Sequence, residues 1–205
     1  MRGKQNVLYK EQRVGVFVDV QNLYYSAKHL YKSKLDFKNI LMKAVGNRML
    51  IRAIAYVVKA DKSSDSGGII VPGSEKSFFD ALKTIGFEVK AKDLQVYGGF
   101  KKGDWDVGIA VDAIEMGTRL DVVIIISGDG DYVPLVEHLK RAFGCKVEVA
   151  AFGRSTSTKL KEAVDDFFDL DIDHEKYLIR SRPRVKKEQN KDENNNERKI
   201  IEMDE

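Results

Sequence analysis

Residues 122–131, VVIIISGDGD, decide the fold class of this chain. Five consecutive β-branched apolar residues are typical of a strand buried on both faces, and such strands belong to parallel sheets covered by helices. The run ends in the turn 128–131, GDGD, whose residue types favour a tight turn. Acidic side chains in that turn would stand at the edge of the sheet, where ligands of such folds bind.

Working outward, similar apolar runs alternate with segments of helical period. Strands are expected at 14–18, 49–58, 87–91, 122–126 and 147–152. Helices are expected around 23–30, 37–44, 74–85, 104–114, 133–140 and 157–168. Ser74 and Asp104 are the expected N-caps of two of these helices, and Gly86 is an expected stop. The alternation predicts an α/β fold with a central parallel sheet and helices on both faces.

The 205 residues, 43% of them hydrophobic, predict one domain with a sizeable core. We expect a flexible N-terminal arm over 1–13, the domain over 14–179 and a disordered charged tail over 180–205. Residues 180–187 of that tail are basic and suit either a nucleic-acid arm or a solvated end. No run reaches the length of a membrane span, no signal peptide is expected, and Cys145 stands alone, which together favour a reducing cytoplasm.

Charge is distributed unevenly along the chain. Residues 104–131 contain seven acids against one base, Arg119, although the chain has a formal net charge of +3. Such an acidic segment within a basic chain suits a metal-dependent enzyme that acts on a polyphosphate. Ordinary fluctuation of charge along a sequence is the alternative explanation.

Acidic residues also follow the expected strands. Asp19 ends the first strand, and Asp129 and Asp131 follow the fourth. Asp106 opens the helix before that strand. Because parallel strands end at the same edge, these four carboxylates are expected to lie close together, where they would repel one another unless a cation binds. Oxygen ligands alone favour Mg²⁺ or Mn²⁺.

Several of these residues also have purely structural interpretations. Asp131 is a possible helix cap, and the glycines of the turn are possible turn formers. Asp112 follows Asp106 by six residues, about 120° around a helix, so it is expected to support the site and not to bind a metal.

Three segments resemble the NYN domains, a branch of the PIN-like nuclease superfamily. They are FVDVQNL at 17–23, the stretch from Lys102 to Asp112, and SGDGDY at 127–132. Residues 157–170 look like the closing helix of that family, and the LabA-like group is the most similar. Trp105 departs from the smaller aliphatic residue that the family more often has at this position.

The resemblance implies a PIN-like three-layer fold with strand order 3-2-1-4-5 and a Mg²⁺- or Mn²⁺-dependent ribonuclease. It implies that Asp19, Asp106 and Asp129 bind the metal, with Asp131 close by. Asn22 would hold a metal-bound water or a phosphate, or would cap the first helix. RNA, single-stranded or structured, is the implied partner, and pairing into a homodimer is a further expectation.

Substrate contacts are expected from residues beside the acids. The candidates are Lys101, Lys102, Ser127, Arg154 and Ser155, the last two at a helix start that attracts anions or is simply capped. The long loop 59–73 is a candidate lid or RNA guide, and Asp61 within it is a candidate further acid. Tyr24, Tyr25 and Trp105 are candidates for base stacking, although packing explains the two tyrosines equally simply.

Two other functions fit the same residues. The chain could be an RNA-binding regulatory scaffold with weak or no catalysis, in which the carboxylates hold Mg²⁺ structurally. It could also be a phosphatase or phospho-acceptor on a similar sheet. Receiver-like phospho-acceptors need a lysine after the fifth strand, where this chain has Phe152-Gly153-Arg154.

Overall fold

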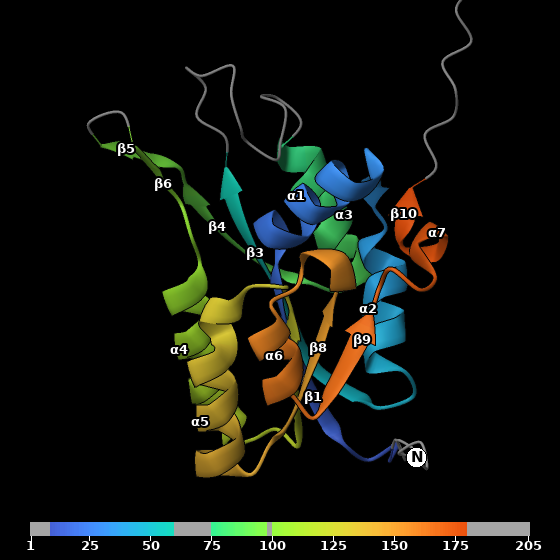
Figure 1. Cartoon of the computed structure of the whole chain (residues 1–205), viewed down its shortest axis with the longest axis vertical. Coiled ribbons are helices and arrows are strands. Elements are labelled where there is room, and N and C mark those ends of the chain that lie inside the picture. Colours follow the sequence, from blue (N-terminus) through green and yellow to red (C-terminus); the bar gives the residue numbers. More distant parts are fainter. Residues whose placement is uncertain (1–8, 60–74, 98–99, 180–205) are drawn as a thin grey trace, which may run out of the picture.

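The computed structural model of the chain describes residues 9–59, 75–97 and 100–179 (Figure 1). Its strands are β1 (Arg13–Asp19), β2 (Lys34–Leu35), β3 (Met49–Lys59), β4 (Glu88–Asp93), β5 (Gln95–Tyr97), β6 (Phe100–Lys102), β7 (Val122–Ile126), β8 (Lys146–Ala151), β9 (Asp166–Asp169) and β10 (Leu178–Ile179). Its α-helices are α1 (Val20–Tyr31), α2 (Phe37–Val45), α3 (Glu75–Ile85), α4 (Asp106–Gly117), α5 (Val133–Phe143), α6 (Thr158–Ala163) and α7 (His174–Tyr177). Two short 3₁₀ helices are η1 (Gly130–Tyr132) and η2 (Gly153–Ser155).

The central sheet has six strands in the order β4-β3-β1-β7-β8-β9, and each neighbouring pair is parallel. The predicted α/β class is confirmed, and the five predicted strands lie in the predicted order. The prediction lacked β9, which pairs with β8 at the edge of the sheet. β1 lies in the interior of the sheet, with β3 and β4 on one side and β7, β8 and β9 on the other. The strand order therefore changes direction at β1, and Asp19 at the carboxyl end of β1 lies where ligands of such sheets bind.

Alternating side chains of the strands fill two separate cores. Val14, Val16 and Val18 of β1 pack with residues of α1, α2 and α3 on one face. Phe17 of the same strand packs with residues of α4, α5 and α6 on the other face. Figure 1 shows these two groups of helices on opposite sides of the sheet. Burial of each valine or phenylalanine side chain contributes about 1.5–3 kcal/mol. Packing on both faces of the sheet therefore stabilises the position of the end of β1.

The last expected helix is wrong in its second half. α6 ends at Ala163, and Asp166–Asp169 forms β9. The reason is that two adjacent phenylalanines point to opposite faces of the sheet. Phe167 packs into the core under α4–α6, and Phe168 packs into the opposite core. Neighbouring side chains on opposite faces require a strand.

The helix caps agree with the sequence only in part. Asp19 caps α1 by accepting a hydrogen bond from Asn22 N, and Gly86 follows α3 with a φ of 113°. The expected cap of α4 is wrong, because Trp105 and not Asp104 is the N-cap residue, and it makes no side-chain cap bond. Ser74 lies outside the described residues.

Two short strand pairs complete the fold and were not expected. β5 and β6 form an antiparallel hairpin before α4, and β10 pairs antiparallel with β2. The second pair returns the end of the described chain to the segment between α1 and α2. The expected arm and tail fall largely on residues 1–8 and 180–205, which lie outside the described residues, so the predicted domain boundaries stay predictions.

Candidate functional site

Four acidic residues come from three elements that meet at the carboxyl edge of the sheet. Asp19 is the last residue of β1, and Asp129 and Asp131 follow β7, the strand paired with β1. Asp106 is the first residue of α4. The parallel pairing of β1 with β7 therefore brings segments more than 100 residues apart to one edge.

Three of these acids form a set with the spacing of metal ligands. One carboxylate oxygen from each of Asp106, Asp129 and Asp131 lies within 4.8 Å of the other two. The first two side chains are half-buried and Asp131 is exposed. An all-oxygen donor set of this kind fits a hard divalent cation such as Mg²⁺ or Mn²⁺ better than a soft metal.

Asp19 lies beside this set and not within it. Its Oδ1 accepts a hydrogen bond of 3.0 Å from Asn22 N. The pKa of Asp19 is raised to about 6, mainly by burial and also by the charges of Asp106 and Asp129, against the opposing effect of its hydrogen bonds. A carboxyl with this raised pKa loses its proton more readily when a cation neutralises its neighbours.

Asp106 is perturbed in the same direction. Burial is the largest cause of its raised pKa, and the charges of Asp129, Asp104 and Asp131 add to it. A hydrogen bond from Tyr132 opposes the rise. The acids of the site therefore raise the pKa of one another, as expected for carboxylates that lie close together.

An open pocket of about 350 Å³ gives access to the acids. Its lining residues are Asp19, Gln21, Asn22, Tyr25, Gly103, Asp104, Trp105, Asp106 and Asp129. The pocket is wide and mostly polar, which suits an extended charged substrate better than a small apolar ligand.

Two polar side chains hold the turn that carries Asp129. Asn22 Oδ1 accepts a hydrogen bond of 2.9 Å from Gly128 N, and Ser127 Oγ accepts one of 3.2 Å from Asp129 N. Ser127 is fully buried. Ser127 was expected to contact the substrate. Its hydroxyl is instead buried and bonded to the turn, so it supports Asp129 and does not line the pocket.

The glycines of the turn are closely packed against the segment before α6. A Cβ on Gly128 would lie 2.9 Å from Thr156 Oγ1, and one on Gly130 would lie 2.8 Å from Ser157 Oγ. Ser157 N also donates to Gly128 O at 3.0 Å. The segment before α6 therefore supports the acidic turn from behind.

Tyr132 contacts two of the acids from the interior of the domain. Its ring is 1% exposed and belongs to the core under α4–α6. Its hydroxyl donates to Asp106 Oδ1 at 3.0 Å and lies 3.4 Å from Asp19 Oδ2. The sequence predicted the turn that contains Tyr132 but gave no role to its hydroxyl, whose direction depends on the tertiary packing.

Trp105 is fixed in place beside the acids. Its Nε1 donates to Val57 O at 3.0 Å, its ring packs edge-on against Tyr56 at 5.3 Å, and Lys92 Nζ lies 4.7 Å from the ring centre.

Of the other aromatic candidates, Tyr25 lines the pocket, whereas Tyr24 packs against the core.

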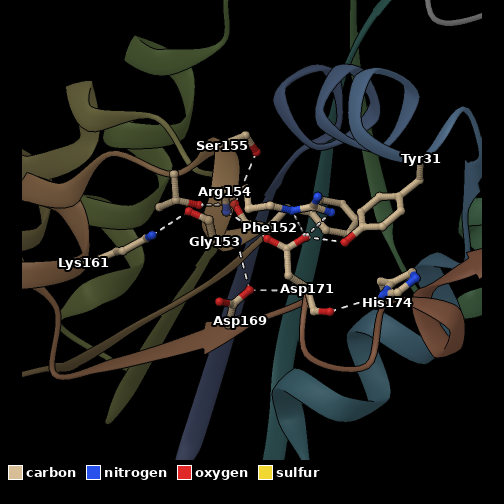
Figure 2. Close-up of polar contacts among 10 residues, drawn as sticks. Tyr31, Phe152, Gly153, Arg154, Ser155, Lys161, Asp169, Asp171 and His174 are labelled. Atoms are coloured by element: carbon tan, nitrogen blue, oxygen red, sulfur yellow. Dashed lines mark hydrogen bonds and ion pairs between the residues drawn. The ribbon is translucent and has the colours of Figure 1, made fainter.

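The expected substrate residues Arg154 and Ser155 belong to a different cluster, which Figure 2 shows. The backbone N–H of Arg154 donates to Asp171 Oδ2 at 2.8 Å, and its guanidinium pairs with Asp171 and lies 4.9 Å from the Tyr31 ring. Ser155 Oγ donates to Phe152 O at 3.2 Å. The predicted anion site at this turn is therefore already filled by the carboxylate of the chain itself.

Of the remaining predicted residues, Asp112 has described contacts, and the others lie wholly or partly outside the described part of the structure. Lys101 and Lys102 belong to β6, directly before α4, but their side chains lie outside the described part of the structure. Asp61 and nearly all of the loop 59–73 lie outside it as well. Asp112 contacts Lys90 Nζ at 2.7 Å and Tyr56 Oη, away from the acidic set.

A family model decides where this chain belongs, because a model of the NYN domain matches residues 13–171. The chain belongs to the NYN domain family. The predicted membership is confirmed, and the match includes all four acids of the site.

Two relatives of this NYN domain extend the comparison. The chain is 25% identical over 172 residues to "Low amplitude and bright protein LabA" of Synechococcus elongatus, an alignment that covers 79% of this chain and 86% of LabA. It is also similar to the crystal structure of VPA0982 from Vibrio parahaemolyticus, a protein described as of unknown function. The TM-score is 0.71 at 34% identity, covering 83% of this chain and 98% of VPA0982.

The NYN domain has helices of modest length. Among the described residues, no helix combines the length and the apolar character that crossing a membrane requires.

Proposed function

We propose that this NYN domain is a Mg²⁺- or Mn²⁺-dependent ribonuclease that hydrolyses phosphodiester bonds of RNA in the cytoplasm. The observation that carries the proposal is the close approach of Asp106, Asp129 and Asp131, whose oxygens lie within 4.8 Å of one another beside a polar open pocket. Membership of a nuclease-like family supports it.

The proposed roles follow from position and charge. Asp106, Asp129 and Asp131 would hold the metal, with Asp19 completing the set once its proton is lost. A bound Mg²⁺ or Mn²⁺ supplies an activated water and neutralises charge on the phosphate. Hydrolysis adds a hydroxyl to phosphorus and returns a proton to the leaving ribose oxygen.

Other residues would orient the reacting groups. Asn22 lines the pocket and holds the turn at Gly128, so we propose that it acts by positioning Asp129. Lys101 and Lys102 directly precede the acidic helix, and we propose that they contact phosphates of the RNA backbone. Arg154 and Ser155 are proposed as outer contacts only, because Asp171 already pairs with the guanidinium of Arg154.

Cleavage of labelled RNA tests the proposal. Wild-type protein, the Asp129→Asn variant and the Asp80→Asn variant are incubated with Mn²⁺, with and without EDTA. Asp80 is an exposed acid on α3 and provides the same chemical change away from the site. We expect cleavage by wild type and Asp80→Asn, and loss of at least a hundredfold in Asp129→Asn and in EDTA.

The same experiment separates the proposal from its rivals. RNA binding without turnover by wild-type protein would contradict the ribonuclease and support the regulatory scaffold. Cleavage by Asp129→Asn at the wild-type rate would contradict the assigned site. Pairing of two chains stays a prediction, which sedimentation analysis of the same protein would test.

A further inference from the structure

Tyr132 connects the three elements that supply the acids. It is part of η1, directly after Asp129 and Asp131, and its hydroxyl reaches Asp106 on α4 and Asp19 on β1. Its ring is packed with the core residues of α4 and α5. The ring is therefore buried and fixed by packing, and its hydroxyl contacts the acids at the base of the site.

The chemistry of this contact is specific to tyrosine. The hydroxyl has one proton, which it donates to Asp106 Oδ1 at 3.0 Å, while Asp19 Oδ2 lies within reach at 3.4 Å. A phenylalanine would fill the same space but would leave the Asp106 oxygen without this donor. Carboxylates that repel one another need such donors to keep a fixed geometry.

From this geometry we infer that Tyr132 is a positioning residue of the metal centre: its hydroxyl fixes the Asp106 carboxylate beside Asp19 so that its other oxygen can face Asp129 and Asp131. The inference rests on the proposed metal-dependent function. Partners that orient ligands in this way typically change metal affinity by about 10- to 100-fold when removed.

The chain offers a matched control in Tyr56. The hydroxyl of Tyr56 also donates to an acid of α4, Asp112, and its ring is also fully buried. Asp112 lies away from the acidic set. The Tyr56→Phe variant therefore loses the same kind of buried hydrogen bond on the same helix without touching the proposed metal ligands.

Titration of Mn²⁺ into the full-length protein by calorimetry tests the inference. We expect Tyr132→Phe to bind Mn²⁺ about 10- to 100-fold more weakly than wild type, and Tyr56→Phe to bind it within about twofold of wild type. Raising Mn²⁺ should restore RNA cleavage by Tyr132→Phe, which a general loss of structure would not permit. Wild-type Mn²⁺ affinity in folded Tyr132→Phe would overturn the inference.

Two further outcomes separate this inference from the proposed function. A wild-type protein that binds Mn²⁺ but cleaves no RNA contradicts the ribonuclease alone, whereas one that binds no Mn²⁺ overturns both. If Tyr132→Phe does not fold, near-UV absorption of wild type and Tyr56→Phe is recorded during Mn²⁺ addition. A tyrosine signal that shifts in both, and also in Tyr25→Phe, supports the inference, because Tyr25 lines the same pocket, and an unchanged spectrum overturns it.

Discussion

Asn22 Oδ1 accepts a hydrogen bond of 2.9 Å from the backbone N–H of Gly128, 106 residues away in the sequence. The same residue donates its own backbone N–H to Asp19 Oδ1. One asparagine therefore joins the end of β1 to the turn after β7, and its position sets the distance between two acids of the site.

We expect Asn22→Ala to destabilise the protein by about 1–3 kcal/mol, because the N–H of the buried residue Gly128 loses its partner. Weaker Mn²⁺ binding should accompany this loss. Urea unfolding and calorimetry measure both. Gln21→Ala is the control, since Gln21 lines the same pocket and its side chain makes no hydrogen bond with the described residues. Equal effects of both variants would contradict the role of the Asn22–Gly128 bond.

Asp19 should make the metal-free protein less stable as the pH rises. Burial raises the pKa of Asp19 to about 6, above the value of about 3.9 for an unfolded chain. A carboxyl of this kind stabilises the fold below about pH 4 and loses that contribution as the pH passes through 6. We therefore expect Asp19→Asn, which keeps a good N-cap residue, to be more stable than wild type by about 3 kcal/mol at pH 8.

Urea unfolding of wild type and Asp19→Asn in EDTA, from pH 4 to pH 8, measures this difference directly. The two proteins should converge near pH 4, and saturating Mn²⁺ should remove the advantage of the variant at pH 8. A constant difference across the pH range would show that Asp19 is not the group responsible.

The opposite pH dependence is expected for Asp121. The backbone N–H and the guanidinium of Arg13 both donate hydrogen bonds to the Asp121 carboxylate, and these bonds lower the pKa of Asp121 to about 2. The contribution is present above about pH 4 and is lost as the pH falls through 2. Because both side chains are well exposed, Asp121→Asn should cost only about 0.5–1 kcal/mol at pH 7. Acid unfolding of both proteins measures it, and identical profiles would refute the prediction.

Gly130→Ala should displace the acidic turn. The added Cβ would lie 2.8 Å from Ser157 Oγ and 3.1 Å from Ser157 Cβ, so the Ser157 hydroxyl must rotate and Ser157 must shift slightly. Overpacking of this kind typically costs about 1–3 kcal/mol. Combining the change with Ser157→Gly removes both contacts and should restore most of the stability and of the Mn²⁺ affinity. No recovery in the double variant would place the strain elsewhere.

The sequence predicted the acids better than it predicted their surroundings. Continuous apolar runs reveal β7 and β8, and the rule that parallel strands end at one edge brings Asp19 close to Asp129. The position of β9 was not predictable in this way, because four residues with two acids carry too weak a pattern, and only packing into two cores separates Phe167 from Phe168.

Contacts that depend on side-chain direction could not be predicted from spacing. Arg154 was expected beside the phosphate, but Asp171, which arrives with the unexpected β9 segment, pairs with it. Likewise Ser127 is buried, and Tyr132 points its hydroxyl at Asp106 only because its ring is held by α4 and α5.

The placement of Tyr132 has a consequence for how this domain can evolve. Its ring is part of the hydrophobic interior and its hydroxyl contacts the acids of the proposed ion site, so the two cannot change independently. If Tyr132 positions Asp106 as inferred above, a substitution at Leu139 or Ile109, both buried in the same core, would alter ion affinity by shifting this ring. Selection for a different metal would therefore act on interior residues as much as on the carboxylates.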